Sequence, residues 1–382
     1  MMHYCTLVCL LVAMQKRYPI GILGATGMVG QRYIQLLEDH PWFEITWLAA
    51  SDRSSGKPYG EAAKWRLDTP LPDRIARMIV SPAEPGGAPP GSIPRIIFAS
   101  VDTAIAREME PKFAAAGCAV ISNSSAFRMA PNVPLVLPEV NADHLEMIEG
   151  QPWRKESGGY IVTNSNCSAM GLVVALKPIE ERFGLEQIFV TTMQAVSGAG
   201  YPGVASMDIL DNVVPFIATE EEKMEAETLK LLGHLDGHSH SVVPLPAKIT
   251  AHCNRVPVVD GHTECVSIKL GNKLGRPVTR EDILSAWADF HPLAGLDLPF
   301  APSQPVEFAP QHDRPQPRLD RNRGKGMTVT VGRLRPCGLL DWKFVLLSHN
   351  TVRGAAGATI LNAEMLASLG KLEPVAEAAM RG

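Results

Sequence analysis

A cysteine lies where a strand is predicted to turn into a helix, in the stretch YIVTNSNCSAMG over residues 160–171. An apolar run there gives way to four small polar residues, and Cys167 follows at the start of a helical pattern. A cysteine becomes a nucleophile when a helix N-terminus or a nearby cation stabilises its thiolate form. Cys167 is therefore a candidate nucleophile, with Asn166 or Ser168 as helix cap or oxyanion donor. Position alone fits a structural thiol at a domain boundary equally well.

A second chemical signal is the glycine turn GILGATGMVG over residues 21–30, which places Gly24, Gly27 and Gly30 between a strand and a helix. Glycine lets the backbone approach a pyrophosphate, and a helix N-terminus offers free N–H groups to it. The spacing is G-x-x-G-x-x-G and departs from the common dinucleotide fingerprint. The pattern favours dinucleotide binding, and the alternative is a tight turn that serves packing only.

The segment SDRSSGK after the second strand points to the kind of dinucleotide. Ser51, Arg53 and Ser54 are suited to binding a 2′-phosphate, which favours NADP. Asp52 would serve the ribose hydroxyls of NAD if it pointed inward, and Arg53 can equally be a solvated surface charge.

These residues need a scaffold, and the order of elements predicts one. Strands alternate with helices over residues 19–50 and again over 95–124, which predicts a parallel, doubly wound α/β sheet of the Rossmann type. After Cys167, strands rich in β-branched residues with few helices between them indicate an α+β domain with a mixed or antiparallel sheet. The Pro/Gly-rich stretch 81–94 and the Pro/Arg-rich stretch 301–326 are predicted to be loops, and a last helix is expected near 353–369.

Bulk composition excludes several classes of protein. The 382 residues are 46% hydrophobic and 20% charged, with a net charge of −4, which argues for a large core and against a protein that coats nucleic acid. The seven cysteines contain no C-x-x-C pair, which is typical of reduced thiols in the cytoplasm. No apolar run is long enough to span a bilayer. Residues 1–13 are expected to be a disordered extension, the alternative being a signal peptide.

The sequence resembles the aspartate-semialdehyde dehydrogenases, particularly the branch found in archaea and fungi. The motifs that carry the resemblance run through residues 20–365: GILGATGMVGQ, SNSSAFRM, PLVLPEVN, NSNCSAMG, TTMQAVSGAGYPG, PFIATEEEKMEAETLKLLG, AHCNRVPVVDGHTE and SHNTVRGAAGATILNAE. Ser168 departs from the family, in which threonine is frequent. The resemblance implies a nucleotide domain at 14–165 and 350–382 and a catalytic and dimerisation domain at 166–349.

The resemblance also implies roles for individual residues. Cys167 would be the nucleophile, Gln194 would orient the acyl group and His262 would be the acid/base. The implied substrate-binding residues are Arg128, Asn166, Glu220, Lys223 and Arg255, with Arg255 on the substrate carboxylate, Glu220 on the amine, and Arg128 and Lys223 on phosphate. The cofactor-binding residues are expected to be Gly24, Thr26, Gly27, Met28, Val29, Ser51, Arg53, Ser54, Ser197, Gly198 and Asn350.

Elementary chemistry agrees with these roles but leaves alternatives. Arginine offers a bidentate fork to carboxylate or phosphate, and histidine titrates near the working pH. Strand parity puts His262 on the same face as Val266 and Ile268, so it should point inward, which also fits a buried core histidine. His252 is a rival for the acid/base role.

Two further segments, one charged and one rich in histidine, each allow more than one interpretation. The segment EEEKMEAETLK is also a charged helical face with ion pairs such as Glu220–Lys223. His234, His238 and His240 suggest a metal site, but no carboxylate or thiol completes it at the expected spacing, so no metal is predicted.

The reaction implied by the resemblance is the NADPH-dependent reductive dephosphorylation of L-aspartyl 4-phosphate to L-aspartate 4-semialdehyde, on the route to lysine, threonine, methionine and isoleucine. The enzyme would be a cytoplasmic homodimer or homotetramer that acts on small molecules, without nucleic-acid or membrane partners. Alternatives are a malonyl- or succinyl-CoA reductase of the same fold, which Glu220 as an amine reader disfavours, and a non-catalytic NADP-binding regulator.

Overall fold

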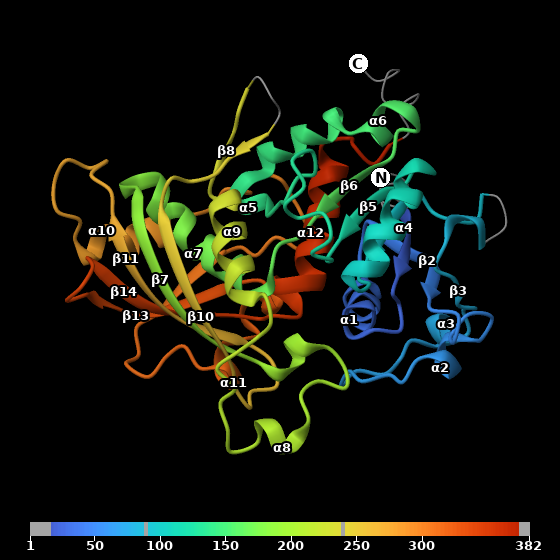
Figure 1. Ribbon diagram of the computed structural model, residues 1–382, viewed down its shortest axis with the longest axis horizontal. Helices are drawn as coiled ribbons and strands as arrows, with labels where there is room; N and C mark the ends of the chain where they lie inside the picture. The colour runs from blue at the N-terminus through green and yellow to red at the C-terminus, as the bar shows by residue number, and fades with distance from the viewer. Residues whose placement is uncertain (1–16, 88–90, 238–240, 374–382) are drawn as a thin grey trace, which may run out of the picture.

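The computed structural model describes residues 17–87, 91–237 and 241–373. Its chain forms a parallel sheet and a mixed sheet that lie side by side, with the C-terminal helix between them (Figure 1). The extension predicted for residues 1–13 lies outside the described residues. Within the described ranges, no helix is both long enough and apolar enough to cross a membrane.

The first sheet has six parallel strands in the order β3-β2-β1-β4-β5-β6, the doubly wound order. Its strands are β1 (Tyr18–Leu23), β2 (Phe43–Ala50), β3 (Ser81–Pro82), β4 (Ile96–Ala99), β5 (Ala119–Ser122) and β6 (Tyr160–Thr163). The helices that accompany it are α1 (Met28–Leu37), α2 (Tyr59–Ala62), α3 (Asp73–Ala76), α4 (Thr103–Ala115), α5 (Pro138–Asn141) and α6 (Pro152–Glu156). β4 and β5 are buried throughout, as expected of strands covered on both faces.

The second sheet also has six strands, in the order β10-β7-β11-β14-β13-β12, and it mixes parallel with antiparallel pairs. Its strands are β7 (Leu185–Gln194), β10 (Lys248–Arg255), β11 (His262–Leu270), β12 (Val306–Ala309), β13 (Val329–Pro336) and β14 (Trp342–Ser348), with β8 (His234–Leu235) and β9 (Val242–Val243) forming a separate ladder. The remaining helices are α7 (Cys167–Phe183), α8 (Ser206–Ile209), α9 (Glu220–Leu231), α10 (Arg280–Ala288), α11 (Pro317–Asp320) and α12 (Gly357–Ser368).

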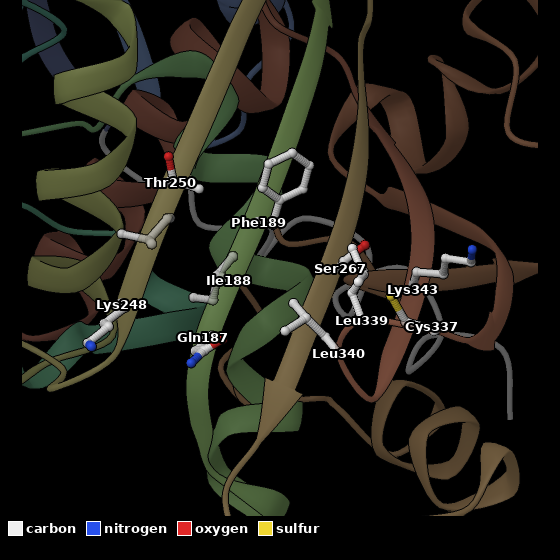
Figure 2. Close-up of a pocket in the computed structure, with 12 residues that line it drawn as sticks. Gln187, Ile188, Phe189, Lys248, Thr250, Ser267, Cys337, Leu339, Leu340 and Lys343 are labelled. Atoms are coloured by element: carbon white, nitrogen blue, oxygen red, sulfur yellow. The ribbon is translucent and has the colours of Figure 1, made fainter.

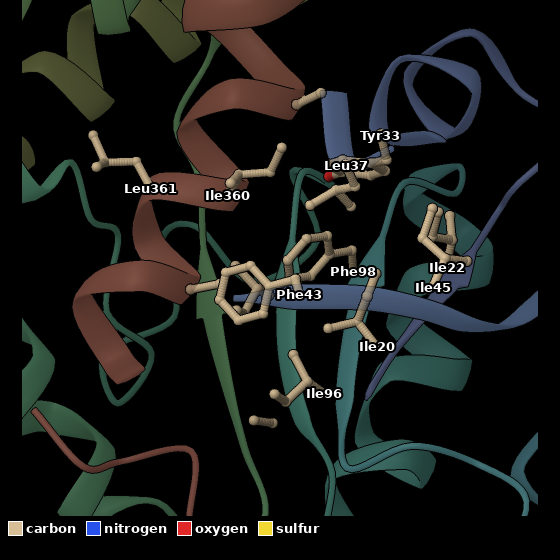
Figure 3. Packing of buried hydrophobic residues seen from close by; sticks show 14 of the residues in the cluster. Ile20, Ile22, Tyr33, Leu37, Phe43, Ile45, Ile96, Phe98, Ile360 and Leu361 are labelled. Carbon is tan, nitrogen blue, oxygen red and sulfur yellow. The ribbon is translucent and has the colours of Figure 1, made fainter. Parts of the chain in front are cut away.

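Among the described residues, three hydrophobic cores hold these layers together, and one of them packs Trp47 and Phe113 with Ile97 of the parallel sheet. The aromatic side chains of Tyr33, Phe43 and Phe98 pack on the parallel sheet, and Ile360 and Leu361 of α12 join them (Figure 3). The chain therefore returns to the parallel sheet at its C-terminal end. The third core lies between α7, which is buried along most of its length, and the inner face of the mixed sheet. This packing fixes the start of α7 against the ends of the strands.

The fold class predicted from the sequence is confirmed, and two predicted loops are wrong in part. Residues 81–82 form the edge strand β3, and the stretch 301–326 contains β12 and α11. These elements are two to four residues long and lie in proline-rich stretches, so their surrounding composition is typical of loops. β12 adds to the sheet through a four-residue parallel ladder with β13, which local periodicity does not reveal.

Candidate active site

Cys167 is the first residue of α7, directly after the corner that ends β6. Asn166 caps this helix, because its Oδ1 accepts hydrogen bonds from the backbone N–H groups of Ser168 at 2.9 Å and Ala169 at 3.1 Å. Ser168 is therefore not the cap, and its buried hydroxyl has no hydrogen-bond partner among the described residues. The side chain of Asn166 thus serves the helix terminus while the residue lines the cavity beside Cys167.

The sulfur of Cys167 lies 3.2 Å from Nε2 of His262, the first residue of β11. The other ring nitrogen, Nδ1, accepts the backbone N–H of Ala195 at 3.0 Å. Because Nδ1 is an acceptor, the neutral ring carries its proton on Nε2 and presents it to the sulfur. His252 lies on the exposed face of β10, away from this pair.

Burial dominates the electrostatics of the pair. It raises the pKa of the Cys167 thiol to about 12, Glu220 raises it further, and Arg128 and Arg255 oppose both effects. Burial, with Arg255 next in effect, lowers the pKa of His262 to about 3. The prediction that His262 titrates near the working pH is therefore wrong for this structure.

The ends of two parallel strands bring the next two predicted residues together. Gln194 ends β7 and Arg255 ends β10, and they face each other in the ladder. One guanidinium nitrogen of Arg255 donates to the carbonyl of Ala195 at 2.7 Å, and the amide nitrogen of Gln194 is buried without a hydrogen-bond partner among the described residues.

A cavity of about 570 Å³ brings together all the predicted catalytic and substrate residues except His262, which contacts Cys167 but does not line the cavity. It is lined by Cys167, Gln194, Arg128, Asn166, Glu220, Lys223 and Arg255, and by the predicted cofactor residues Met28, Val29, Ser197, Gly198 and Asn350. Arg128 follows β5, Glu220 and Lys223 lie in the first turn of α9, Arg255 ends β10 and Asp102 precedes α4, so four separate segments contribute charged groups. The cavity therefore combines a nucleophile with two guanidinium groups, an ammonium group and two carboxylates, those of Asp102 and Glu220.

A neighbouring cavity of about 590 Å³ shares Met28, Val29 and Gly198 with the first one and extends over Thr26 and Gly27. Gly27 precedes α1 with no side-chain cap, so the first N–H groups of that helix face the cavity edge. Such a helix start suits a phosphate group, which fits the predicted dinucleotide.

Gly24 takes no part in lining these cavities. It has a φ of +88°, and a β-carbon there would lie 2.5 Å from the carbonyl oxygen of Ser100, so glycine serves the close approach of two backbones. Ser51, Arg53 and Ser54 form a turn after β2 and line neither cavity, so their part in cofactor binding stays a prediction.

Asn350 is held by two hydrogen bonds. Its Oδ1 accepts the backbone N–H of Gly261 at 2.8 Å, and its Nδ2 donates to the hydroxyl of Ser197 at 2.8 Å. This amide fixes the segment that carries Ser197 and Gly198, which packs over Arg255 and His262.

Several residues of the site were not predicted from the sequence. Lys64, Arg66 and Tyr201 line the second cavity, and the Arg66 guanidinium donates to the Tyr201 hydroxyl at 2.8 Å and lies over its ring. Gly354 packs against the nucleophile, since a β-carbon there would lie 2.8 Å from Cβ of Cys167. Glu227 binds both Arg128 and the corner before Cys167. Glu227 was not singled out from the sequence, and its seven-residue spacing from Glu220 places both carboxylates on one face of α9.

His234 lies in β8 and is exposed, and His238 and His240 lie outside the described residues. In the part of the chain that the structure describes, no three His, Cys, Asp or Glu side chains form a group that could hold a metal ion.

The fold and the paired thiol and imidazole agree with the family models that the chain matches, which are those of the semialdehyde dehydrogenases. The chain matches the model of the semialdehyde dehydrogenase NAD-binding domain over residues 19–148 and that of the dimerisation domain over residues 176–353. It is 50% identical to aspartate-semialdehyde dehydrogenase from Archaeoglobus fulgidus over 92% of this chain and 98% of the relative, and 46% identical to the Candida albicans enzyme over 91% and 97%.

A crystal structure of the Candida albicans enzyme with NADP superimposes with a TM-score of 0.84 at 44% identity, covering 92% of this chain and 99% of the other. The chain belongs to the aspartate-semialdehyde dehydrogenase family. The family, fold and enzyme class predicted from the sequence are thereby confirmed.

Proposed function

We propose that this chain catalyses the NADPH-dependent conversion of L-aspartyl 4-phosphate to L-aspartate 4-semialdehyde and phosphate, with Cys167 as nucleophile. The observation that carries the proposal is the 3.2 Å contact between the Cys167 sulfur and Nε2 of His262, beside a cavity lined by Cys167, two arginines, one lysine and two carboxylates. The relatives of the chain carry the same enzyme name across archaea and fungi.

Four of the charged groups of the cavity match the substrate in sign. Arg255 is proposed to bind the α-carboxylate through its fork, and Glu220 to accept hydrogen bonds from the amine. Arg128 and Lys223 are proposed to bind the phosphate. A substrate with two anionic ends and one ammonium group thus finds a complementary partner for each of them.

The proposed chemistry proceeds in two stages on the sulfur. The sulfur of Cys167 attacks the acyl carbon, the C–O bond to phosphate breaks, and phosphate leaves with the bond electrons and the thiol proton, which gives a thioester. Bound NADPH supplies the hydride that reduces this acyl group. The adduct then collapses by breaking the C–S bond, and His262, the proposed acid/base, lies with its Nε2–H toward the reacting oxygen or sulfur. Gln194 holds the acyl oxygen with its otherwise unpartnered amide nitrogen.

The residues around the second cavity fit NADP. Thr26, Gly27, Met28 and Val29 are proposed to bind the pyrophosphate through the uncapped start of α1. Ser197, Gly198 and Asn350 are proposed to lie beside the nicotinamide. Ser51, Arg53 and Ser54 follow β2, and they are proposed to bind the 2′-phosphate.

The test is NADPH formation from aspartate semialdehyde, which should require phosphate and vanish in Cys167→Ala. Absence of turnover in the wild type, or turnover that survives the alanine variant, would overturn the proposal. A parallel assay offers malonyl-CoA with NADPH, and activity there without activity on aspartate semialdehyde would assign the chain to the acyl-CoA reductases instead.

The chain is also proposed to form a homodimer or a homotetramer in the cytoplasm. The outer face of the mixed sheet supports assembly, because it holds an open hollow of about 760 Å³ lined by apolar groups of neighbouring strands. Figure 2 shows Phe189 and Leu339 there, and their exposed fractions are 40% and 95%. Exposed apolar groups of this size favour a protein partner, and the family model that covers this sheet is a dimerisation domain.

Light scattering should give at least twice the mass of the 41.3 kDa chain, and Phe189→Glu should lower it. Leu319→Glu, at an exposed leucine of α11, is the matched control. A wild type that elutes as a monomer would contradict the proposed assembly.

A further inference from the structure

Glu227 is a buried carboxylate of α9 that the proposed chemistry does not use. Its exposed fraction is 2%, and one of its oxygens, Oε2, accepts the backbone N–H of Asn166 at 2.6 Å and the hydroxyl of Ser165 at 2.7 Å. These two residues form the corner directly before Cys167. The carboxylate thus fixes the backbone from which the nucleophile projects.

The same carboxylate also binds the guanidinium of Arg128. Nη1 of Arg128 lies 3.2 Å from Oε1 and 3.4 Å from Oε2 of Glu227, and its Nη2 donates to the carbonyl of Asn123 at 2.6 Å. Two anchors on opposite sides of the fork therefore set the direction in which the remaining N–H groups of Arg128 point. Bidentate recognition of an anion depends on that direction.

A second residue of α9 fixes the main chain of the same loop. The ammonium group of Lys230 donates to the carbonyl oxygens of Arg128 at 2.6 Å, Ala130 at 3.2 Å and Val133 at 3.3 Å. Lys230 holds the backbone of the Arg128 loop while Glu227 holds its side chain. The loop from the parallel-sheet side thereby keeps one position relative to the nucleophile.

Four polar residues of α9 occupy one stripe of the helix, at positions 220, 223, 227 and 230. This spacing of three and four places them on the same face. Glu220 and Lys223 line the cavity, whereas Glu227 and Lys230 are buried against the loop and the corner. We propose that Glu227 is a positioning residue that aligns the phosphate-binding Arg128 with the nucleophile Cys167, an assignment that rests on the proposed function.

Two substitutions separate the contact of Glu227 with Arg128 from its contact with the corner before Cys167. In Glu227→Gln the amide oxygen still accepts from Asn166 and Ser165, but the amide nitrogen meets Arg128 as a second donor and the charge is lost. The KM for inorganic phosphate in the aspartate semialdehyde assay should rise about tenfold, the value of one charge-assisted hydrogen bond, with kcat nearly unchanged. In Glu227→Ala both anchors disappear, so kcat should also fall.

The matched control is Glu225→Gln on the same helix. Glu225 also accepts a backbone N–H, that of Ala251 at 3.0 Å in β10, but it contacts neither Arg128 nor the corner. Its KM for phosphate and its kcat should stay at the wild-type values. A purely structural effect would lower the fraction of folded enzyme in any of these variants without changing KM.

A readout that does not depend on the substrate is the alkylation rate of Cys167 by iodoacetamide, followed by mass spectrometry. It should be near the wild-type rate in Glu227→Gln and altered by at least about threefold in Glu227→Ala, since only the latter frees the corner. An unchanged KM in Glu227→Gln, or the same changes in Glu225→Gln, would overturn the assignment while leaving the proposed function intact. If the wild type itself fails to turn over aspartate semialdehyde, the proposed function falls, and equal alkylation rates in all variants would overturn the assignment as well.

Discussion

The backbone N–H of Ala195 donates a hydrogen bond of 3.0 Å to Nδ1 of His262, and this single contact sets which ring nitrogen faces Cys167 with a proton. Protonation of Nδ1 would put two donors against each other. Together with burial, which lowers the pKa of His262 to about 3, the contact keeps the ring neutral.

The first prediction concerns this ring. Nitrogen-15 NMR of the free enzyme should show His262 as the Nε2–H tautomer, with no titration between about pH 5 and 8, where an unperturbed histidine would change its charge. A midpoint near 6.5 for His262 would contradict the structure.

Thiol reactivity provides a second prediction. The charge of Glu220 raises the pKa of Cys167, so Glu220→Gln should lower that pKa and speed up alkylation at pH 7 by about two- to tenfold. Because the folded pKa of the thiol is about 12, the rate in the wild type should keep rising with pH through the neutral and alkaline range. Exposed Glu222→Gln on the same helix should leave the rate unchanged.

A methyl group at Gly198 should disturb the site directly. Its β-carbon would lie 2.8 Å from Nη1 of Arg255 and 3.3 Å from Nε2 of His262, so one of these groups must move. Gly198→Ala should lower kcat/KM by about tenfold to a hundredfold, as a misplacement of about 1 Å does. Gly150→Ala, whose β-carbon meets nothing within 4 Å, should behave as wild type in the same assay.

Two arginine variants can show which residue binds the 2′-phosphate that distinguishes NADP from NAD. Arg53→Ala should weaken NADP binding by about tenfold or more and leave NAD binding nearly unchanged, because only NADP carries the 2′-phosphate. Arg66→Ala should weaken both cofactors alike, since Arg66 lines the cavity next to the glycine turn. If Arg66→Ala alone removes the discrimination in fluorescence titrations, the 2′-phosphate binds at Arg66 and the proposed role of Arg53 is wrong.

A buried ion pair gives a prediction on stability. Arg353 and Glu139 are both fully enclosed, and their side chains meet at 2.6 Å beneath the segment that packs on Cys167. Glu139→Ala should lower the free energy of unfolding by about 3–5 kcal/mol, because the guanidinium is left buried without its counter-charge. Urea denaturation measures this loss. Replacing both residues, as Glu139→Leu with Arg353→Met, should cost less than the single change.

Local pattern was sufficient for much of the fold. β1, α1 and β2 were predicted within a few residues, since alternation and helical spacing are strong there and glycine marks the turn. β12 was not, because it is stabilised by pairing with β13 and its own sequence is typical of a loop. Long-range pairing of this kind leaves no periodic signal.

The site residues also divide into those that local sequence motifs predict and those that only tertiary contacts reveal. The nucleophile and its neighbours lie in motifs that can be read from the chain, whereas Glu227 looks like one more charge on a solvated helix. Its partners, Asn166 and Arg128, are 61 and 99 positions away, so its burial follows from tertiary packing alone. The pKa values of Cys167 and His262 were misjudged for the same reason, because desolvation is a property of the packed site and not of a residue type.

The stripe on α9 limits how this site can change in evolution. One residue inserted between Lys223 and Glu227 would rotate the second half of the helix by about 100° and turn its anchors away from the loop that they hold. Loss or gain of a residue in this helix would therefore uncouple substrate recognition from the nucleophile in one event. Homologues that accept other acyl donors are expected to keep the length of α9 and to differ by exchanges at its first turn.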